Sequence, residues 1–453
     1  MTHRLNSVTI SRDLAVKALN RIDKGLYAER ALSEVLSETR VFEKDRSLTT
    51  EIVYGTVRWR MRLDSTIDKF LRYDGKLKSE IRNVLRIAFY QLFFLNRIPA
   101  HSIVHQAVAQ AKNLFEGKFS GLVNAILRSA LRNPEVYKSG PTGNAQSLSV
   151  YYSHPEWLVK NWLARFGAQQ TVQILEFNNQ RARLTLRVNC IKAHLTEVIK
   201  LFEKEGLVFD ILCKDRGSLT VRWIGRPVTD LPGFKEGLFA IQDYASQMIA
   251  PILKAEPSNE ILDVGGAPGG KAAHIAALVN NRARINLLDV SMDRLDEARK
   301  NLERLGINCV KIIHGDATQK SFILSLGEFD RILIDAPCSN LGVLRHNCDV
   351  KYRLNPNNLI KLAEKQLVML SESAGALKKG GILVYCVCST SCEETTQVIE
   401  KFLASNKNFV IYRIEPEEIS HPNFLTQEGY LLTFPPVEQF PVDGFFAARI
   451  KRN

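Results

Sequence analysis

The spacing of apolar residues predicts helices in the first third of the chain. Between residues 81 and 93, apolar side chains recur at intervals of three and four, which places them on one face of an amphipathic helix. Pro99 then ends the pattern. Shorter stretches of the same kind cover residues 14–22, 47–61, 101–115 and 122–131. Strand-like alternation is absent from this part of the sequence, so we expect residues 1–139 to form an all-α domain.

The pattern changes twice further along the chain. Residues 140–149 carry no charge and are typical of a linker. Short helical and strand-like stretches then alternate, and we expect residues 140–240 to hold this linker and a small α/β subdomain that binds RNA. From residue 241 to residue 453, short apolar strands are separated by helices, which predicts a parallel, doubly wound sheet of the Rossmann type. These strands are expected at residues 260–263, 285–289, 310–313, 331–335, 381–386 and 445–450.

Composition narrows the classes of function. No apolar stretch approaches the roughly 20 residues of a membrane-spanning helix, and the first 13 residues lack the apolar core of a secretory signal. Eight cysteines in 453 residues are too few for a disulfide scaffold. We therefore expect a cytoplasmic protein with reduced thiols and no membrane partner.

The positive charge is concentrated in the predicted helical domain. Residues 1–140 hold 24 Lys and Arg against 14 Asp and Glu, which is +10 of the chain's net charge of +13. Such a concentration indicates a polyanion partner, usually nucleic acid, although a solubilising surface would give the same balance. The run 58–62 mixes arginines with Trp59, as an RNA-binding face does, although Trp59 could equally pack inward.

A glycine-rich turn follows the first strand of the predicted sheet. It reads Asp-Val-Gly-Gly-Ala-Pro-Gly-Gly-Lys over residues 263–271. In a doubly wound sheet, ligands bind beyond the carboxyl ends of the strands, where this turn is expected to lie. Its glycines miss the G-x-G-x-x-G spacing that seats the pyrophosphate of a dinucleotide. A nicotinamide dinucleotide is therefore a poor match for this turn.

Acidic residues mark the same edge of the predicted sheet. Asp263, Asp289, Asp316 and Asp335 end strands or follow them directly. Four carboxylates around one crevice suit the sulfonium and ribose of S-adenosylmethionine (SAM) better than a pyrophosphate. The alternative is that they are turn and capping residues, a role that Asp favours in any protein.

Two cysteines are also expected at this edge. Cys338 lies in Asp-Ala-Pro-Cys-Ser after one strand, and Cys388 lies in Tyr-Cys-Val-Cys-Ser after another. No C-x-x-C pair or neighbouring histidine accompanies them, so we do not expect a metal site. A cysteine alone is most often a small core residue. Two of them near an Asp favour covalent catalysis, because a thiolate added to carbon 6 of a pyrimidine makes carbon 5 able to accept a methyl group.

These motifs resemble those of the NOL/NOP/Sun family of RNA cytosine-C5 methyltransferases. The resemblance covers nearly all of residues 150–453 and rests on the motifs at 242–247, 263–271, 335–339, 385–389 and 443–447. The helical N-terminal part, through Val-Asn-Ala-Ile-Leu-Arg at 123–128, is similar to the NusB-like RNA-binding module. The combination is typical of the bacterial enzymes of this family that act on 16S rRNA.

The resemblance implies a role for each matching residue. Cys388 would be the nucleophile, Cys338 would assist product release, and Asp335 would contact the target base and the cofactor. The residues expected to bind SAM are Gly265, Gly266, Ala267, Pro268, Gly269, Gly270, Lys271, Asp289, Asp316 and Asp335.

The implied reaction is methylation of carbon 5 of a cytosine in 16S ribosomal RNA, at the cytosine-967 site, by a metal-free monomer. The same chemistry on a tRNA or 23S rRNA cytosine stays open, and so does a non-catalytic RNA-binding or antitermination factor.

Four positions depart from the family pattern, and so does the run Arg-His-Asn-Cys-Asp at 345–349. Gly265 and Gly266 stand where Cys and Ala are usual, and Val387 stands where Thr commonly precedes the nucleophile. Asn340 stands where Gly or Ala is usual. None of the four removes a group that the expected chemistry needs.

Overall fold

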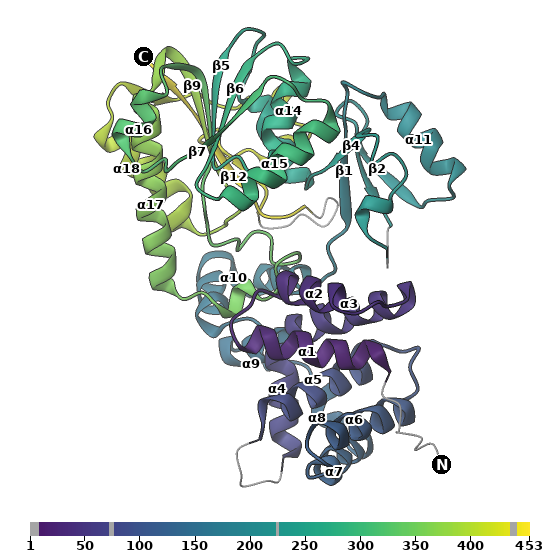
Figure 1. The fold of residues 1–453 in the computed structure, drawn as a ribbon. Helices are drawn as coiled ribbons and strands as arrows, with labels where there is room; N and C mark the ends of the chain where they lie inside the picture. Colours follow the sequence, from purple (N-terminus) through teal and green to yellow (C-terminus); the bar gives the residue numbers. More distant parts are fainter. Residues whose placement is uncertain (1–8, 72–76, 223–225, 435–441) are drawn as a thin grey trace. The chain divides into compact units, whose positions relative to one another are not determined.

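The computed structural model describes residues 9–71, 77–222, 226–434 and 442–453, and these form two compact units (Figure 1). The domain boundaries expected after residues 139 and 240 stay predictions. The first unit comprises Met1–Gln180, Ile224–Arg226 and Leu344–Arg353, and the second comprises Arg181–Trp223, Pro227–Val343 and Leu354–Asn453.

The first unit is helical, as the periodicity predicted. The apolar faces of the helices between residues 10 and 132 pack into a common core that includes Leu14, Ile52, Val84 and Phe89. A helix at Ala28–Ser37 was not predicted. The helices are α1 (Ile10–Asp23), α2 (Ala28–Ser37), α3 (Glu43–Arg58), α4 (Arg60–Phe70), α5 (Ser79–Phe94), α6 (Ala100–Leu114), α7 (Ser120–Arg132), α8 (Glu135–Lys138), α9 (Ala145–Tyr152) and α10 (Glu156–Asn178).

The expected linker is only partly irregular. Helix α9 begins at Ala145, so the prediction of a linker over residues 140–149 is wrong for its second half. The Asn144 side chain accepts a hydrogen bond from the Ser147 backbone N–H and caps this helix, which is the role that Asn favours. The absence of charge in this stretch therefore did not indicate the absence of a helix.

The arginine-rich run 58–62 is used inside the first unit. Trp59 ends helix α3 and stacks on Phe94 with ring centroids 4.8 Å apart, so the alternative that it packs inward is confirmed. Arg60 pairs with Asp23 at 2.9 Å. The Arg62 guanidinium lies 4.0 Å from the centre of the Tyr151 ring. The run therefore takes part in the packing of the first unit.

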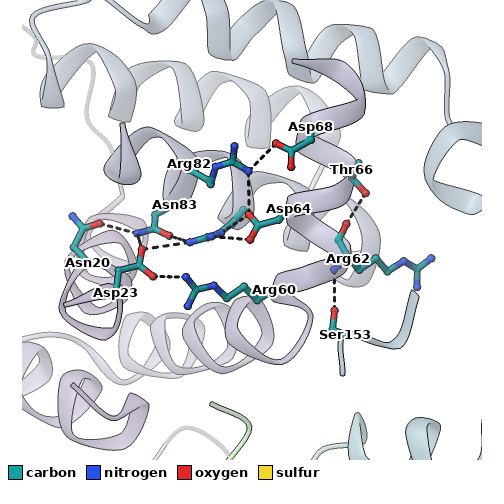
Figure 2. Close-up of polar contacts among 11 residues, drawn as sticks. Asn20, Asp23, Arg60, Arg62, Asp64, Thr66, Asp68, Arg82, Asn83 and Ser153 are labelled. Carbon is teal, nitrogen blue, oxygen red and sulfur yellow. Dashed lines mark hydrogen bonds and ion pairs between the residues drawn. The ribbon is translucent and has the colours of Figure 1, made fainter. Parts of the chain in front are cut away.

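A buried ion-pair network joins helices α1, α4 and α5 (Figure 2). The side chain of Arg86 is 7% exposed and donates two hydrogen bonds to Asp64, at 2.7 and 2.8 Å. Asp23 lies 3.4 Å from Arg86 on the other side. The fork of a guanidinium matches a carboxylate, so the pair fixes how the three helices pack.

A short segment from later in the sequence completes the first unit. Residues 344–353 follow the predicted motif at 335–339, yet they pack among the N-terminal helices. Lys351 is buried there and donates to the Arg58 carbonyl at 3.1 Å. Burial lowers the pKa of Lys351 to about 7. The Asp349 carboxylate accepts from the Ala28 N–H, which begins helix α2.

The second unit contains a small antiparallel sheet with strand order β2-β3-β1-β4. Helix α11 packs on one face of it through Val198 and Phe202. Its elements are β1 (Leu184–Val188), α11 (Leu195–Lys204), β2 (Phe209–Cys213), β3 (Ser218–Val221) and β4 (Phe239–Ile241).

An eight-stranded sheet forms the rest of the second unit, with order β10-β12-β9-β8-β5-β6-β7 and β11 beside β12. Strands β5 to β9 run parallel, whereas β12 is antiparallel to β9. This confirms the doubly wound Rossmann-like fold. The strands are β5 (Glu260–Val264), β6 (Arg284–Asp289), β7 (Val310–His314), β8 (Phe329–Asp335), β9 (Leu377–Val387), β10 (Phe409–Ile411), β11 (Leu431–Leu432) and β12 (Phe446–Arg452).

Helices cover both faces of this sheet (Figure 1). On one side lie α12 (Tyr244–Gln247), α13 (Ile249–Ile252), α14 (Gly270–Leu278) and α15 (Met292–Leu305), and on the other lie α16 (Lys320–Ser325), α17 (Pro356–Gly375) and α18 (Thr396–Ser405). Across the described parts of the chain, we find no helix with the length and apolar character to cross a membrane.

The ion-pair network of the first unit gives a stability test. Asp64→Ala leaves the buried Arg86 guanidinium without its main partner, and we expect a loss of about 3 kcal/mol in the free energy of unfolding. The matched change Asp68→Ala removes a 56% exposed carboxylate that contacts Arg82, and we expect a loss below about 1 kcal/mol. Calorimetric unfolding of the full chain measures both, and equal losses would contradict the assignment.

Candidate active site

The order of the parallel strands creates a crevice in the second unit. The chain moves outward from β5 to β6 and β7, and then returns to the other side of β5 as β8. Ligands bind at such a switch point, beyond the carboxyl ends of the strands. A cavity of about 410 Å³ lies there. Six of the residues predicted from the sequence line it: Gly265, Asp289, Asp316, Asp335, Cys338 and Cys388.

The rest of the glycine-rich turn supports the cavity without lining it. Gly265 has a positive φ of 71°, and a Cβ there would lie 2.4 Å from the Asp335 carbonyl oxygen. A Cβ on Gly266 would lie 2.5 Å from Asp263 Oδ2. Only glycine allows this close approach of the turn to β8. The backbone therefore requires glycine at 265 and 266, where the family usually has Cys and Ala. Residues 266–271 lie behind Gly265 and do not line the cavity.

Three carboxylates, and not the expected four, line the cavity. Asp289 ends β6 and is 4% exposed, and its Oδ1 accepts from the Ser291 N–H at 2.9 Å. Hydrogen bonds from the Thr318 N–H and hydroxyl lower the pKa of Asp316. Asp263 is instead fully buried behind the turn. Burial, reinforced by the charge of Asp335, raises the pKa of Asp263 to about 8.

Asp335 is held by an ion pair at the edge of the cavity. Its Oδ2 lies 2.7 Å from Nζ of Lys271, whose side chain is 11% exposed. Burial opposes the charge on Lys271, but the carboxylate of Asp335 outweighs it and raises the pKa of the amine. The predicted Lys271 therefore acts on the site through Asp335, whose side chain keeps 26% of its surface exposed.

The two predicted cysteines meet in the cavity. The parallel register pairs Asp335 with Cys386, which brings the turns after β8 and β9 side by side. The Sγ atoms of Cys338 and Cys388 lie 3.2 Å apart. The hydrogen bond with Cys388, together with burial and the negative charge nearby, raises the pKa of the Cys338 thiol well above its usual range.

Asn340 completes the surroundings of Cys388. Its Oδ1 lies 2.8 Å from Cys388 Sγ and accepts the thiol hydrogen. The residue has a φ of +57°, a left-handed conformation that Asn tolerates better than most side chains. The sequence showed Asn340 only as a departure from the family pattern, and its contact with a thiol 48 residues away was not predicted.

A buried carboxylate joins the two cysteine turns. Glu394 is 0% exposed and accepts hydrogen bonds from the Ser339 N–H at 2.8 Å and from the Ser339 hydroxyl. It also accepts from the hydroxyl of Ser389 and from the amide of Gln366. Ser339 and Ser389 directly follow the two cysteines, so Glu394 sets the distance between their sulfur atoms. Sequence reasoning did not predict this role, because an acidic residue among serines after a strand is common.

The hydrogen-bond acceptors of this cavity fit a nucleoside that carries no phosphate. Asp289 Oδ2 is buried and, among the described residues, has the ion pair with Arg294 but no hydrogen bond; it lies at the end of β6, where ribose hydroxyls are bound in this architecture. Of the cations that line the cavity, Arg294 is held by Asp289 at 3.3 Å. The volume also lies within the range of small-molecule sites.

Comparison with known proteins agrees with this geometry. Residues 250–451 match the family described as 16S rRNA methyltransferase RsmB/F. Residues 9–132 match the NusB family, and residues 154–213 match the ferredoxin-like domain of RsmF/B-like methyltransferases. The all-α, small α/β and Rossmann-like parts expected from the sequence are thus confirmed.

Two curated relatives span essentially the whole chain. The probable ribosomal RNA small subunit methyltransferase B of Bacillus subtilis is 31% identical, over 98% of this chain and 99% of that protein. The corresponding protein of Synechocystis is 33% identical, over 97% of this chain and 98% of its own length. The crystal structure of the protein PH0851 shares the fold, with a TM-score of 0.80 and 22% identity over 100% of both chains. The chain is therefore a methyltransferase that belongs to the RsmB family.

Proposed function

We propose that this chain transfers a methyl group from SAM to carbon 5 of a cytosine in 16S ribosomal RNA, through a temporary bond between Cys388 and the base. The observation that carries the proposal is the pair of thiols, 3.2 Å apart, in the cavity that Asp289, Asp316 and Asp335 line. A methyltransferase that acts on a more reactive atom has no need of two thiols beside its cofactor site.

The cofactor is assigned to the part of the cavity formed by β5, β6 and β7. Gly265 permits close approach of the backbone, Asp289 presents an oxygen for the ribose hydroxyls, and Asp316 lies beyond them. When bound, SAM supplies an electrophilic methyl group on a positively charged sulfur. The carboxylates of this wall favour that positive charge.

Cys388 is assigned as the nucleophile because it lines the cavity beside Asp335 and occupies the position of the nucleophile in the family motif. The Cys388 thiolate adds to carbon 6 of the cytosine, and the electron pair moves to carbon 5, which takes the methyl group. A base then removes the proton from carbon 5, and the bond between sulfur and carbon 6 breaks. Asp335, fixed by Lys271, is placed to contact the ring N3 and N4 groups and so to stabilise the adduct.

Cys338 is assigned to the release of the product. Its thiol lies against Cys388 Sγ and its pKa is raised, so it is a proton-bearing neighbour of the sulfur that must leave the base. A protonated thiol at this position favours departure of Cys388 by donating to the developing thiolate.

The substrate assignment rests on the relatives. Two of them, aligned over nearly the full length, are named for the small ribosomal subunit RNA. The NusB-family part carries most of the positive charge, which suits a phosphate backbone. A tRNA or 23S rRNA cytosine would use the same chemistry and is distinguished by the experiment below.

Replacement of the nucleophile tests the reaction. We expect Cys388→Ala to abolish methylation while SAM binding, measured by calorimetry, persists, because the thiol adds to the base and does not hold the cofactor. Bisulfite sequencing of 16S rRNA, 23S rRNA and tRNA from cells with each variant identifies the target. The control Cys309→Ala removes a thiol that does not line the cavity and should retain activity. Turnover by Cys388→Ala would move the nucleophile elsewhere.

Loss of the second thiol should trap the intermediate. We expect Cys338→Ala to accumulate a covalent adduct between protein and RNA, because addition to the base proceeds while departure of Cys388 is slowed. A denaturing gel shows the adduct as a band of reduced mobility. The double variant Cys338→Ala/Cys388→Ala should show none. A single variant without a shifted band would argue against the release role.

The contact between Asn340 and Cys388 gives a test on the thiol itself. We expect Asn340→Asp to slow alkylation of Cys388 by iodoacetamide about tenfold at neutral pH, because a carboxylate 2.8 Å away opposes a second negative charge. Asn340→Gly keeps the left-handed backbone without a charge and should alkylate at a rate close to that of the parent. Peptide mass spectrometry follows Cys388 separately from Cys338. Equal rates in the Asp and Gly variants would contradict the contact.

A further inference from the structure

A second cavity of the second unit has the opposite electrostatic character. It has a volume of about 490 Å³ and lies between the small antiparallel sheet and helices α13 and α14. Three of its lining residues carry cationic side chains: Arg187, Lys214 and Arg216. His194 and His274 line it too, and Asp215 is the one acidic residue among the described lining residues.

Arg187 is a buried cation without a counter-charge. It is 2% exposed, on β1, and its Nε donates to Gln242 Oε1 at 2.8 Å. Within the described part of the chain, its terminal amino groups have no hydrogen bond, and no carboxylate pairs with it. Burial lowers the pKa of Arg187 to about 10. A buried, unpaired guanidinium is costly, so its presence on a cavity wall points to a missing anion.

Two other residues of the cavity, Arg216 and His274, also have a buried nitrogen without a partner among the described residues. Arg216 is held in place by the Glu418 carbonyl, and its Nη1 is buried without a partner in the described residues. His274 is 6% exposed, and its Nδ1 likewise has no partner there. Burial, together with the charges of Arg187 and Arg216, lowers the pKa of His274 well below its usual range, so both arginines act on this imidazole as uncompensated charges.

We propose that this cavity binds a phosphate group. Two arginines present forked donors that match the tetrahedral oxygens of a phosphate, and Lys214 adds a third positive charge at the exposed side. The apolar lining, which includes Val188 and Pro251, lowers the local dielectric constant and strengthens the attraction. The phosphate comes either from the RNA backbone or from free phosphate, and the site does not depend on the chemistry at Cys388.

Thermal unfolding of the full chain tests the site with inorganic phosphate. At about ten times its Kd, phosphate should raise the Tm by about 3 °C relative to chloride of equal ionic strength. Arg187→Met and Arg216→Gln should lose this rise. Arg187→Met should also keep its Tm in chloride, because it removes an unpaired buried charge. The control Arg183→Gln removes a 63% exposed cation next to the same strand, outside the cavity, and should keep the full rise.

Binding of RNA to the same proteins separates the two sources of phosphate. A stem-loop that contains the target cytosine is titrated by fluorescence anisotropy at several salt concentrations, with Cys388→Ala in every protein so that no adduct forms. If the site takes a backbone phosphate, Arg216→Gln lowers the slope of log K against log salt by about one, and Arg183→Gln lowers it less. If the cavity variants lose the phosphate-induced rise in Tm but the slope of log K against log salt stays unchanged, the site binds free phosphate. A rise retained in both cavity variants, together with an unchanged slope, overturns the proposal.

Discussion

The active-site geometry depends on one buried carboxylate. Glu394 lies in the core of the second unit, and it accepts hydrogen bonds from the hydroxyls of Ser339 and Ser389 and from the backbone N–H of Ser339. A buried charge of this kind is tolerated only when its hydrogen-bonding capacity is filled, and here filling it requires both turns to converge on one point. The 3.2 Å separation of Cys338 and Cys388 follows from this requirement.

A third segment is held to these turns by backbone alone. The Gly342 N–H donates to the Cys388 carbonyl, and the Gly444 N–H donates to the Gly342 carbonyl. A Cβ on Gly342 would lie 1.8 Å from the Gly444 carbonyl oxygen, so these backbone segments could not come this close to one another if residue 342 had a side chain. The segment that contains Gly444 belongs to the last motif of the sequence. Backbone hydrogen bonds therefore hold Gly342 and Gly444, which are about 100 positions apart in the sequence, beside the nucleophile.

Much of this arrangement follows from patterns in the sequence. Short apolar runs separated by helical stretches located β5 to β9, and parallel strands bring their carboxyl ends to one edge. That rule alone placed Asp289, Asp335, Cys338 and Cys388 in one cavity. It failed for Asp263, which is the second-to-last residue of β5, because successive side chains of a strand point to opposite faces and this one is buried in the core. The prediction of a linker over residues 140–149 failed for a different reason: the absence of charge was taken as the absence of structure.

The sequence determined the fold, the sheet edge that carries the site and the residue types that perform the chemistry, because these depend on short-range periodicity and on the fixed direction of parallel strands. Tertiary structure alone decided which groups act on the two sulfur atoms. Asn340 and Glu394 are ordinary polar residues in the sequence, and they become specific only where packing removes water and leaves each with a single set of partners. Hydrogen bonds between distant segments carry no local signature, so the identity of these partners appears only once the chain has folded.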